Sequence, residues 1–493
     1  MSRTNNVISQ RAGWSRFLRQ MNVLSVVLRV LAGLSQRAPI LAIVLVICTA
    51  TEPSQAETLQ HALATAYTAN PKLDAERARQ RADDELVPQA LSGTRPTLTA
   101  TGEVGLVRSF SRSNVSGSVL HSMTNSTPRG LSVNVSQPLF DGFRTSAATA
   151  AAEASVLAGR YALSNVEQNV LLDAVTAYVD VVRDTALVRL TQSNLDVLRE
   201  ELESTNARFD VGELTKTDVA QAEARISGAV SGMSQSRANL ARSRAIYERV
   251  IRRPPGTLSA PASLSGLLPR SLDDAYKVGE SEHPALLSTR HTIEASDHEV
   301  KNIKGELLPS LSLDSKYSRI WDPTTSGVLD TESTSIFGRL TVPLYQAGSV
   351  SSRVRQARQR STQRRLEAEN IRADVRAAIV SSWDGLIAAR AQIGADRQQI
   401  HATSLALEGV RQEQRVGQRT TLDVLDAQKE LLNAQLDLAT STRDEVVAAY
   451  TLLAAIGRLT APRLHLPVAY YDPTVHYDKV RNKWWGLGAD SPN

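Results

Sequence analysis

The chain has 493 residues, of which 42% are hydrophobic and only 4% aromatic, a composition that suits long helices better than a compact β-rich enzyme core. Its formal charge of +5 comes from the first 56 residues, which contain six arginines and a single acidic residue. The rest of the chain has equal numbers of acidic and basic residues, so it lacks the basic surface expected of a nucleic-acid-binding protein.

The N-terminus has the pattern of a secretory signal peptide. Arginines precede a short apolar run, 39–47, and a small-x-small pattern follows at Ser54-Gln55-Ala56. We expect cleavage after this pattern, which makes the signal peptide 1–56 if translation starts at the first methionine rather than at Met21. The only cysteine, Cys48, lies inside it, so we expect no disulfide and no cysteine-based metal site in the exported chain. No later run approaches the roughly 20 apolar residues of a transmembrane helix. The exported chain is therefore expected to be soluble or to insert as a β-barrel.

The sequence after this leader contains a duplication of about 210 residues. Asn70-Pro71 is matched by His283-Pro284, and Pro138-Leu-Phe140 is matched by Pro343-Leu-Tyr345. A period this long indicates a duplicated domain rather than a short solenoid repeat. The predicted divisions are the signal peptide 1–56, a first structural repeat 57–253, a linker 254–270, a second structural repeat 271–459 and a C-terminal tail 460–493.

Each repeat is predicted to be mainly helical. It begins with a helical stretch, 58–92 or 272–308, and later contains a very long helix without proline, 144–210 or 349–415. At 1.5 Å per residue each long helix spans about 100 Å. A shorter helix returns along it, and in the second repeat the apolar residues of this helix, from Leu425 to Leu453, are spaced as in a coiled coil, which we interpret as core. We expect the long helix of the first repeat to pack against two shorter helices placed end to end, 71–92 and 217–251.

Two segments with alternating apolar and polar residues precede each long helix and predict strands. The segments that join them are rich in Ser, Thr, Asn and Gly and are predicted to be loops. Four strands cannot close around a lumen, and lipid does not tolerate open sheet edges, so several chains would have to share one barrel in a membrane. The alternative is a small sheet that caps a soluble helical rod. The predicted strands are 98–106, 131–136, 311–317 and 336–342, and the predicted loops are 109–128 and 322–333.

Several motifs resemble those of the TolC-like outer-membrane efflux and type I secretion channels. They are Asn70-Pro71, Gln137-Pro-Leu-Phe-Asp-Gly142, Val342-Pro-Leu-Tyr345 and Gly417-Gln-Arg-Thr-Thr-Leu-Asp-Val-Leu-Asp-Ala427. The resemblance covers essentially the whole mature chain. It implies a mainly α fold with a membrane β-barrel portion, in which a homotrimer shares a 12-stranded barrel in the outer membrane of a Gram-negative bacterium. The helices would continue as a hollow α-barrel across the periplasm, and the C-terminal tail 460–493 would be periplasmic.

The same resemblance implies a function and a set of partners. The protein would be an exit duct for type I protein secretion, for tripartite drug efflux, or for both. It would contact outer-membrane lipid and be recruited by a periplasmic adaptor protein and an inner-membrane transporter of the ABC or RND type. We expect no enzymatic activity and no cofactor, since no catalytic or nucleotide-binding motif is present. The alternative is a secreted or periplasmic helical coiled-coil scaffold without a pore.

Two matching turns are predicted where each long helix reverses direction. Gly212 and Gly417 can adopt the left-handed conformation that ends a helix. Thr-x-x-Asp patterns that end at Asp218 and Asp423 predict capping boxes at the start of the next helix. Capping alone would account for both aspartates.

Asp426 needs another explanation, because it lies three residues beyond the second capping box. Its counterpart in the first repeat is Gln221, so the repeats differ at this position. The family resemblance implies that Asp423 and Asp426 face the periplasmic entrance of the channel. Three chains would then place six carboxylates around one constriction and form a cation-attracting gate.

The resemblance also implies a network that holds this gate closed. It would link Arg419 to the pair Thr217 and Asp218 of a neighbouring hairpin. The family's best-known member has a tyrosine three residues before the turn glycine, whereas this chain has Gln414, whose amide could form a hydrogen bond instead.

Two further groups of residues have simpler interpretations. Six arginines between 353 and 365 crowd the start of the second long helix; they are interpreted as a solvated face, with contact to lipid phosphate or to the duct lumen as the alternative. His291 and His298 share a helix face but lie two turns apart, too far to bind one metal ion alone.

Overall fold

The computed structural model describes residues 56–261, 264, 266–323 and 328–488, and those from Glu57 onward belong to one unit. The predicted signal peptide lies outside the described residues, apart from Ala56. None of the described helices is both long enough and apolar enough to cross a bilayer.

The predicted helical stretch that opens each repeat is divided into separate helices at the Asn-Pro or His-Pro pair. Asn70 and His283 have extended backbones, and the residue before a proline is disfavoured in the helical region. Each side chain caps the next helix, accepting the N–H of Lys72 at 2.9 Å or of Ala285 at 3.2 Å. The resulting elements are α3 (Leu59–Ala69), α4 (Pro71–Asp84), α5 (Leu86–Leu91) and η1 (Ser92–Thr94) in the first repeat, and α8 (Leu272–Glu282) and α9 (Pro284–Gly305) in the second.

The four predicted strands are confirmed and form one antiparallel sheet in the order β1-β4-β5-β6. The central pair, β4 and β5, joins the two repeats, with Arg129 opposite Trp321. β1 and β6 are the edges of this sheet. The bounds are β1 (Thr97–Val104), β4 (Arg129–Phe140), β5 (Ser310–Trp321) and β6 (Asp330–Thr341).

The prediction of a loop over 109–128 is wrong, because this segment forms a second antiparallel pair, β2 (Val107–Val115) and β3 (Ser118–Ser126). Ser116 and Gly117 form its two-residue turn, both with positive φ, and the side chain of Asn114 accepts the N–H of Gly117 at 3.1 Å. The polar composition that suggested a loop is compatible with a strand pair exposed on both faces. In the second repeat β5 continues to Trp321 and β6 begins at Asp330, so strand also replaces part of the predicted loop 322–333 there.

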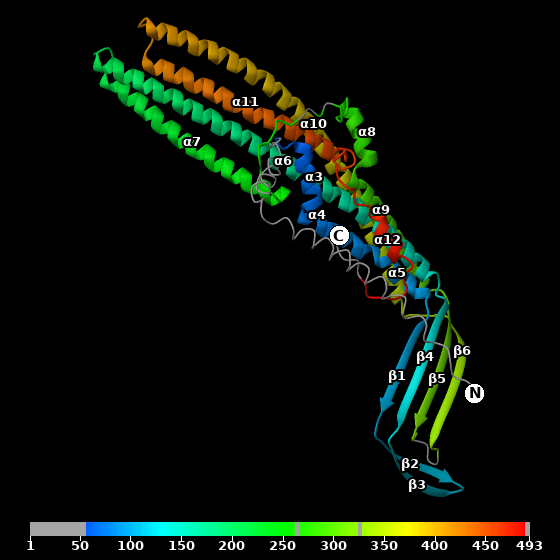
Figure 1. Cartoon of the computed structure of the whole chain (residues 1–493). Helices are drawn as coiled ribbons and strands as arrows, with labels where there is room; N and C mark the ends of the chain where they lie inside the picture. Colours follow the sequence, from blue (N-terminus) through cyan, green and yellow to red (C-terminus); the bar gives the residue numbers. More distant parts are fainter. Residues whose placement is uncertain (1–55, 262–263, 265, 324–327, 489–493) are drawn as a thin grey trace, which may run out of the picture. The chain divides into compact units, whose positions relative to one another are not determined.

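The long helices have the predicted bounds, as α6 (Arg144–Asp210) and α10 (Ser349–Arg415). They return through α7 (Lys216–Ile251) and α11 (Thr421–Ala455). α6 packs against α7 and, further along, against α4 and α5, which confirms the expected end-to-end arrangement of shorter helices. α6 also contacts α9 and α11 of the second repeat. The sheet therefore lies at one end of α6 and α10, and the helical turns lie at the other (Figure 1).

Both repeats enter the long helix through two consecutive residues with positive φ. These are Gly142 (71°) and Phe143 (64°) in the first repeat, and Ala347 (51°) and Gly348 (75°) in the second. Both repeats therefore have two left-handed residues here, but glycine is the first of the two in the first repeat and the second of the two in the second repeat. A Cβ at Gly142 would lie 2.4 Å from the carbonyl oxygen of Gly305, so glycine is required there by space as well as by conformation.

The main hydrophobic core lies where α3, α6, α7 and α11 meet. Tyr178 of α6 is fully buried, and its hydroxyl donates to the backbone oxygens of Glu57 (2.6 Å) and Ser259 (2.8 Å). Glu57 also pairs with Leu258 in an isolated parallel bridge. The start of the described chain and the predicted linker are thus fixed to the same tyrosine.

Candidate functional site at the helical turns

The two hairpin turns have the predicted local structure. Gly212 and Gly417 have φ of 80° and 78° and lie directly after the long helices. In the first turn the backbone N–H of Thr215 donates to Asp218 at 2.9 Å, and the N–H of Asp218 donates to the Thr215 hydroxyl at 3.4 Å. Thr420 and Asp423 form the same reciprocal pair in the second turn, which confirms both capping boxes.

These caps keep the turn aspartates ionised. Hydrogen bonds from the backbone and hydroxyl of Thr420 lower the pKa of the Asp423 carboxyl, and the Arg419 guanidinium lowers it further. The hydroxyl and backbone of Thr215 lower the pKa of Asp218 in the same way. Both carboxylates therefore carry negative charge at neutral and at mildly acidic pH.

Asp426 does not belong to the cap and instead joins the two hairpins. Its carboxylate forms an ion pair with the guanidinium group of Arg225, which lies on α7 of the other hairpin. The side chains are 54% and 32% exposed, respectively. Next to this pair, a groove of about 510 Å³ lies between α6, α7 and α11, and the residues that line it include Gly228 and Gly232 of α7.

Arg225 is not among the site residues predicted from the sequence, although the duplication contains a signal for it. In the first repeat Gln221 and Arg225 occupy the positions that Asp426 and Glu430 occupy in the second. The two repeats therefore differ in charge at both positions. Such a difference between matched helices is a pattern that points to a contact between them.

The predicted closing residues form contacts within their own hairpins. Arg419 pairs with Glu413 at 2.9 Å, and Gln414 donates weakly to the Thr421 hydroxyl at 3.4 Å. Thr217 and Asp218 lie in the first turn of α7, in the other hairpin. A single chain therefore does not bring Arg419 to this pair, and the predicted link stays a prediction for neighbouring chains.

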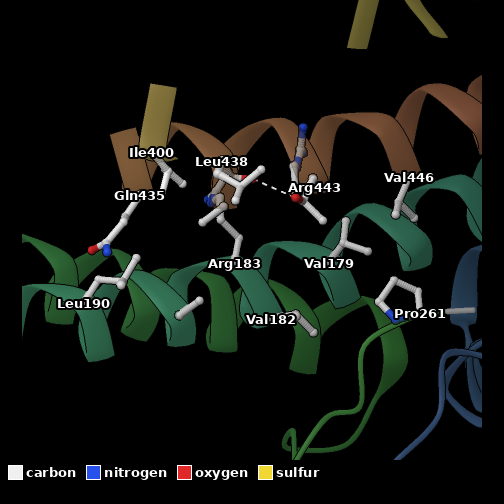
Figure 2. A pocket seen from close by; sticks show the side chains of 13 residues that line it. Val179, Val182, Arg183, Leu190, Pro261, Ile400, Gln435, Leu438, Arg443 and Val446 are labelled. Atoms are coloured by element: carbon white, nitrogen blue, oxygen red, sulfur yellow. Dashed lines mark hydrogen bonds between the residues drawn. The ribbon is translucent and has the colours of Figure 1, made fainter. Parts of the chain in front are cut away.

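A second groove, of about 460 Å³, separates the hairpins further from the turns (Figure 2). Apolar side chains of α6 and α11, including Val179 and Leu438, line it together with Pro261 of the linker. Arg443 of α11 also lines it and donates to Asp180 of α6 at 2.8 Å. Ionic contacts thus connect the hairpins at two levels, through Arg443 here and through Arg225 near the turns.

The arginine cluster at the start of α10 is partly neutralised. Arg353 pairs with Glu306 and Arg365 pairs with Asp297, at 2.6 Å in each case. These arginines are exposed, as expected of a solvated helix face. Within the described ranges, no group of three or more His, Cys, Asp and Glu residues could hold a metal ion.

Comparison with known proteins identifies the family. Residues 62–246 and 277–458 match the family described as outer membrane efflux protein, and the two matched segments correspond to the two repeats. The chain belongs to this family. The predicted resemblance to the TolC-like channels is therefore confirmed.

Individual relatives match this chain over most of their length. The outer membrane efflux protein BepC of Brucella suis is 40% identical over 431 residues, which cover 87% of this chain and 92% of BepC. The outer membrane protein TolC of Escherichia coli is 26% identical over 422 residues, covering 82% and 83%. The solved structure of the CmeC outer membrane channel of Campylobacter jejuni matches with a TM-score of 0.73 at 14% identity, over 86% of this chain and 89% of CmeC.

These relationships establish the fold and the location. The chain has the fold of the outer-membrane channels, and it resides in the outer membrane with its helices extending into the periplasm. The family consists of channel proteins rather than enzymes.

Proposed function

We propose that three copies of this chain form an exit duct in which each contributes β1, β4, β5 and β6 to a shared 12-stranded barrel. The observation that supports this most directly is the four-stranded sheet with two open edges. Three of its strands are 12 residues long, enough to cross the hydrocarbon core of a membrane. Because lipid does not tolerate unpaired strand edges, β1 of one chain must pair with β6 of the next.

The helical turns form the periplasmic entrance of this duct. Three copies of Asp423 and Asp426 place six carboxylates there, and the capped Asp423 carboxylates stay charged at mildly acidic pH. Arg419 reaches Thr217 and Asp218 of the neighbouring chain in the closed state, and Gln414 takes the place of the family's tyrosine. The entrance attracts cations as a result.

The cargo is expelled by an inner-membrane transporter of the ABC or RND type, joined to the duct by a periplasmic adaptor. The 40% identity to an outer membrane efflux protein supports efflux as the main activity. Complementation of a bacterium that lacks its own efflux duct tests this directly, through drug accumulation. Restored protein secretion without restored drug efflux would instead assign the duct to type I secretion.

Purification from outer membranes, followed by mass measurement and planar-bilayer recording, tests the pore itself. We expect a trimer with small, cation-preferring currents, and we expect the double substitution Asp423→Ala/Asp426→Ala to reduce the cation preference. Asp196→Ala is a matched control, because Asp196 is an exposed acid on α6 well away from the turns. A water-soluble species without conductance would overturn the proposal and favour the scaffold. Unchanged selectivity in the double variant would contradict the proposed cation-attracting gate.

A further inference from the structure

The C-terminal tail, whose position no sequence pattern predicted, is bound to the first repeat. The N–H of Ala461 donates to Glu167 of α6 at 2.7 Å, and the N–H of Tyr471 donates to the hydroxyl of Tyr67 on α3 at 3.0 Å. A short helix, α12 (Thr474–Val480), then packs against α4. The tail therefore runs from the core of the molecule along the helices that lead to β1 (Figure 1).

Contacts of α12 and the residue after it fix the tail in this position. Nδ1 of His476 lies 3.0 Å from a carboxylate oxygen of Asp84, which is fully buried on α4. Arg481 pairs with Glu153 of α6 at 2.8 Å. The polar contact with buried Asp84 thus holds α12 to α4, and the ion pair of Arg481 holds the end of α12 to α6.

The tail ends beside the first strand of the sheet. The guanidinium group of Arg95 donates to the backbone oxygen of Lys483 at 2.7 Å and lies over the ring of Trp484 at 5.1 Å. Arg95 precedes the first residue of β1, Thr97, by two positions, which corresponds to about 7 Å of extended chain. Trp484 is therefore held at the level where the chain passes from helix to strand.

Three large apolar side chains at this point are exposed. Trp485 is 90% exposed, Trp484 is 67% exposed and Leu487 is fully exposed. Two cationic side chains lie beside them: Arg95 over Trp484, and Lys483, which donates to the backbone oxygen of Gly488 at 3.1 Å. Two adjacent indole rings in water are unfavourable, whereas the interface between lipid and water favours tryptophan, and cationic side chains beside it can meet lipid phosphates.

We propose that Trp484, Trp485 and Leu487 form an anchor that inserts into the periplasmic leaflet of the outer membrane. The outer-membrane location of the family places the helix-to-strand junction at this interface, and the contacts of Arg95 hold the tail there. The anchor extends the membrane contact of each chain beyond its sheet and fixes the height of the duct in the bilayer.

A single environment-sensitive label tests the anchor. In a Cys48→Ser background, Trp485→Cys provides the only thiol of the full-length chain, which is labelled with a nitrobenzoxadiazole fluorophore and reconstituted into phosphatidylethanolamine–phosphatidylglycerol vesicles. Matched labels at Ile336→Cys on β6 and at Leu405→Cys on α10 report lipid and water. Ile336 lies on the same face of β6 as Leu340, the apolar face that a barrel strand turns to lipid, and Leu405 is exposed on a helix outside the sheet. Lipids with a quencher near the headgroup should remove most of the emission at position 485, and quenchers deep in the acyl chain should remove less.

The outcomes separate the anchor from the barrel on which it rests. Quenching at 336 and 485 but not at 405 supports the anchor. Quenching at 336 alone overturns the anchor and leaves the membrane-embedded sheet intact. No quenching at 336 or 485 overturns both.

Intrinsic fluorescence provides a second measurement in case the label disturbs the tail. The emission lost in the Trp484→Phe/Trp485→Phe variant isolates this pair from the other tryptophans. Quenching of that component by headgroup-labelled lipid supports the anchor, whereas quenching by aqueous iodide alone overturns it.

Discussion

The ion pair between Arg225 and Asp426 gives the most specific prediction for the channel entrance. It links α7 to α11 where a groove of about 510 Å³ leaves the packing between the hairpins loose. Because both side chains are substantially exposed, the pair contributes about 0.2–1 kcal/mol per chain rather than the larger energy of a buried pair. This energy corresponds to roughly a 1.4- to 5-fold change in the equilibrium between the paired and the separated hairpins of each chain.

The pair also determines how much charge the proposed entrance carries. With Arg225 present, the three Asp426 carboxylates are compensated and the three Asp423 carboxylates provide most of the field. Arg225→Gln should therefore raise both the conductance and the preference for cations, whereas Asp426→Asn should not increase cation preference. The charge-reversed double variant Arg225→Asp/Asp426→Arg should restore the pair and return the conductance toward the wild-type value.

A double-mutant cycle in planar bilayers measures this coupling. Conductance and zero-current potential are compared in 0.1 M and 1 M KCl, where the Debye lengths are about 10 Å and 3 Å. The change in selectivity should shrink in the higher salt, because it arises from screened charges, whereas a change in packing would persist. Strictly additive effects of Arg225→Gln and Asp426→Asn, with no rescue by charge reversal, would refute the link between the hairpins.

Three other substitutions test single steps of the structural reasoning. Gly142→Ala should lower the unfolding temperature of the purified protein much more than Gly348→Ala. Both glycines have positive φ, which costs alanine about 1–2 kcal/mol, but only at Gly142 would the added Cβ also meet a backbone oxygen. Equal losses would contradict this reasoning. His283→Ala should cost about 1 kcal/mol of stability, whereas His283→Asn, which copies the cap at Asn70, should not. Burial lowers the pKa of His283, so its contribution falls as the pH drops below about 6.5, and His283→Asn should remove this loss in unfolding measured between pH 7 and 5. The lowered pKa of Asp423 predicts that cation preference in the Asp426→Asn variant is still largely present at about pH 3.9, the ordinary pKa of aspartate, and a half-loss of that preference at or above this pH would show that the cap does not hold the carboxyl ionised.

The contribution of the Asp423 cap to folding stability depends on pH, and the lowered pKa of Asp423 sets the direction of this dependence. The carboxylate is favoured in the folded state, so the cap is fully formed above the ordinary pKa of aspartate, near 3.9. Its contribution is lost as the pH falls through the lower value of the folded state. The turn is therefore expected to resist mild acid.

The sequence by itself determined the features that depend on neighbouring residues. Two proline-free segments gave the bounds of α6 and α10, because helix formation depends on local hydrogen bonds that proline would interrupt. Gly212, Gly417 and the Thr-x-x-Asp patterns gave the turns, because capping satisfies groups only three residues apart. The duplication gave the order of elements, and motif resemblance gave the family.

Composition was a poor guide where strands are exposed on both faces. β2 and β3 lack a buried side, so their serines and asparagines resemble a loop although the backbone pairs regularly. Similarly, the breaks at Asn70 and His283 interrupt stretches whose overall composition is helical.

Only the tertiary structure decided which distant residues meet. Arg225 and Asp426 are 201 positions apart, and His476 and Asp84 are separated by 392, so no local pattern predicts either contact. Trp484 and Trp485 gained a location only when Arg95 and the helices of the first repeat fixed the tail beside β1. Such contacts depend on the packing of whole helices, whereas the sequence directly encodes the preferences of single turns and caps.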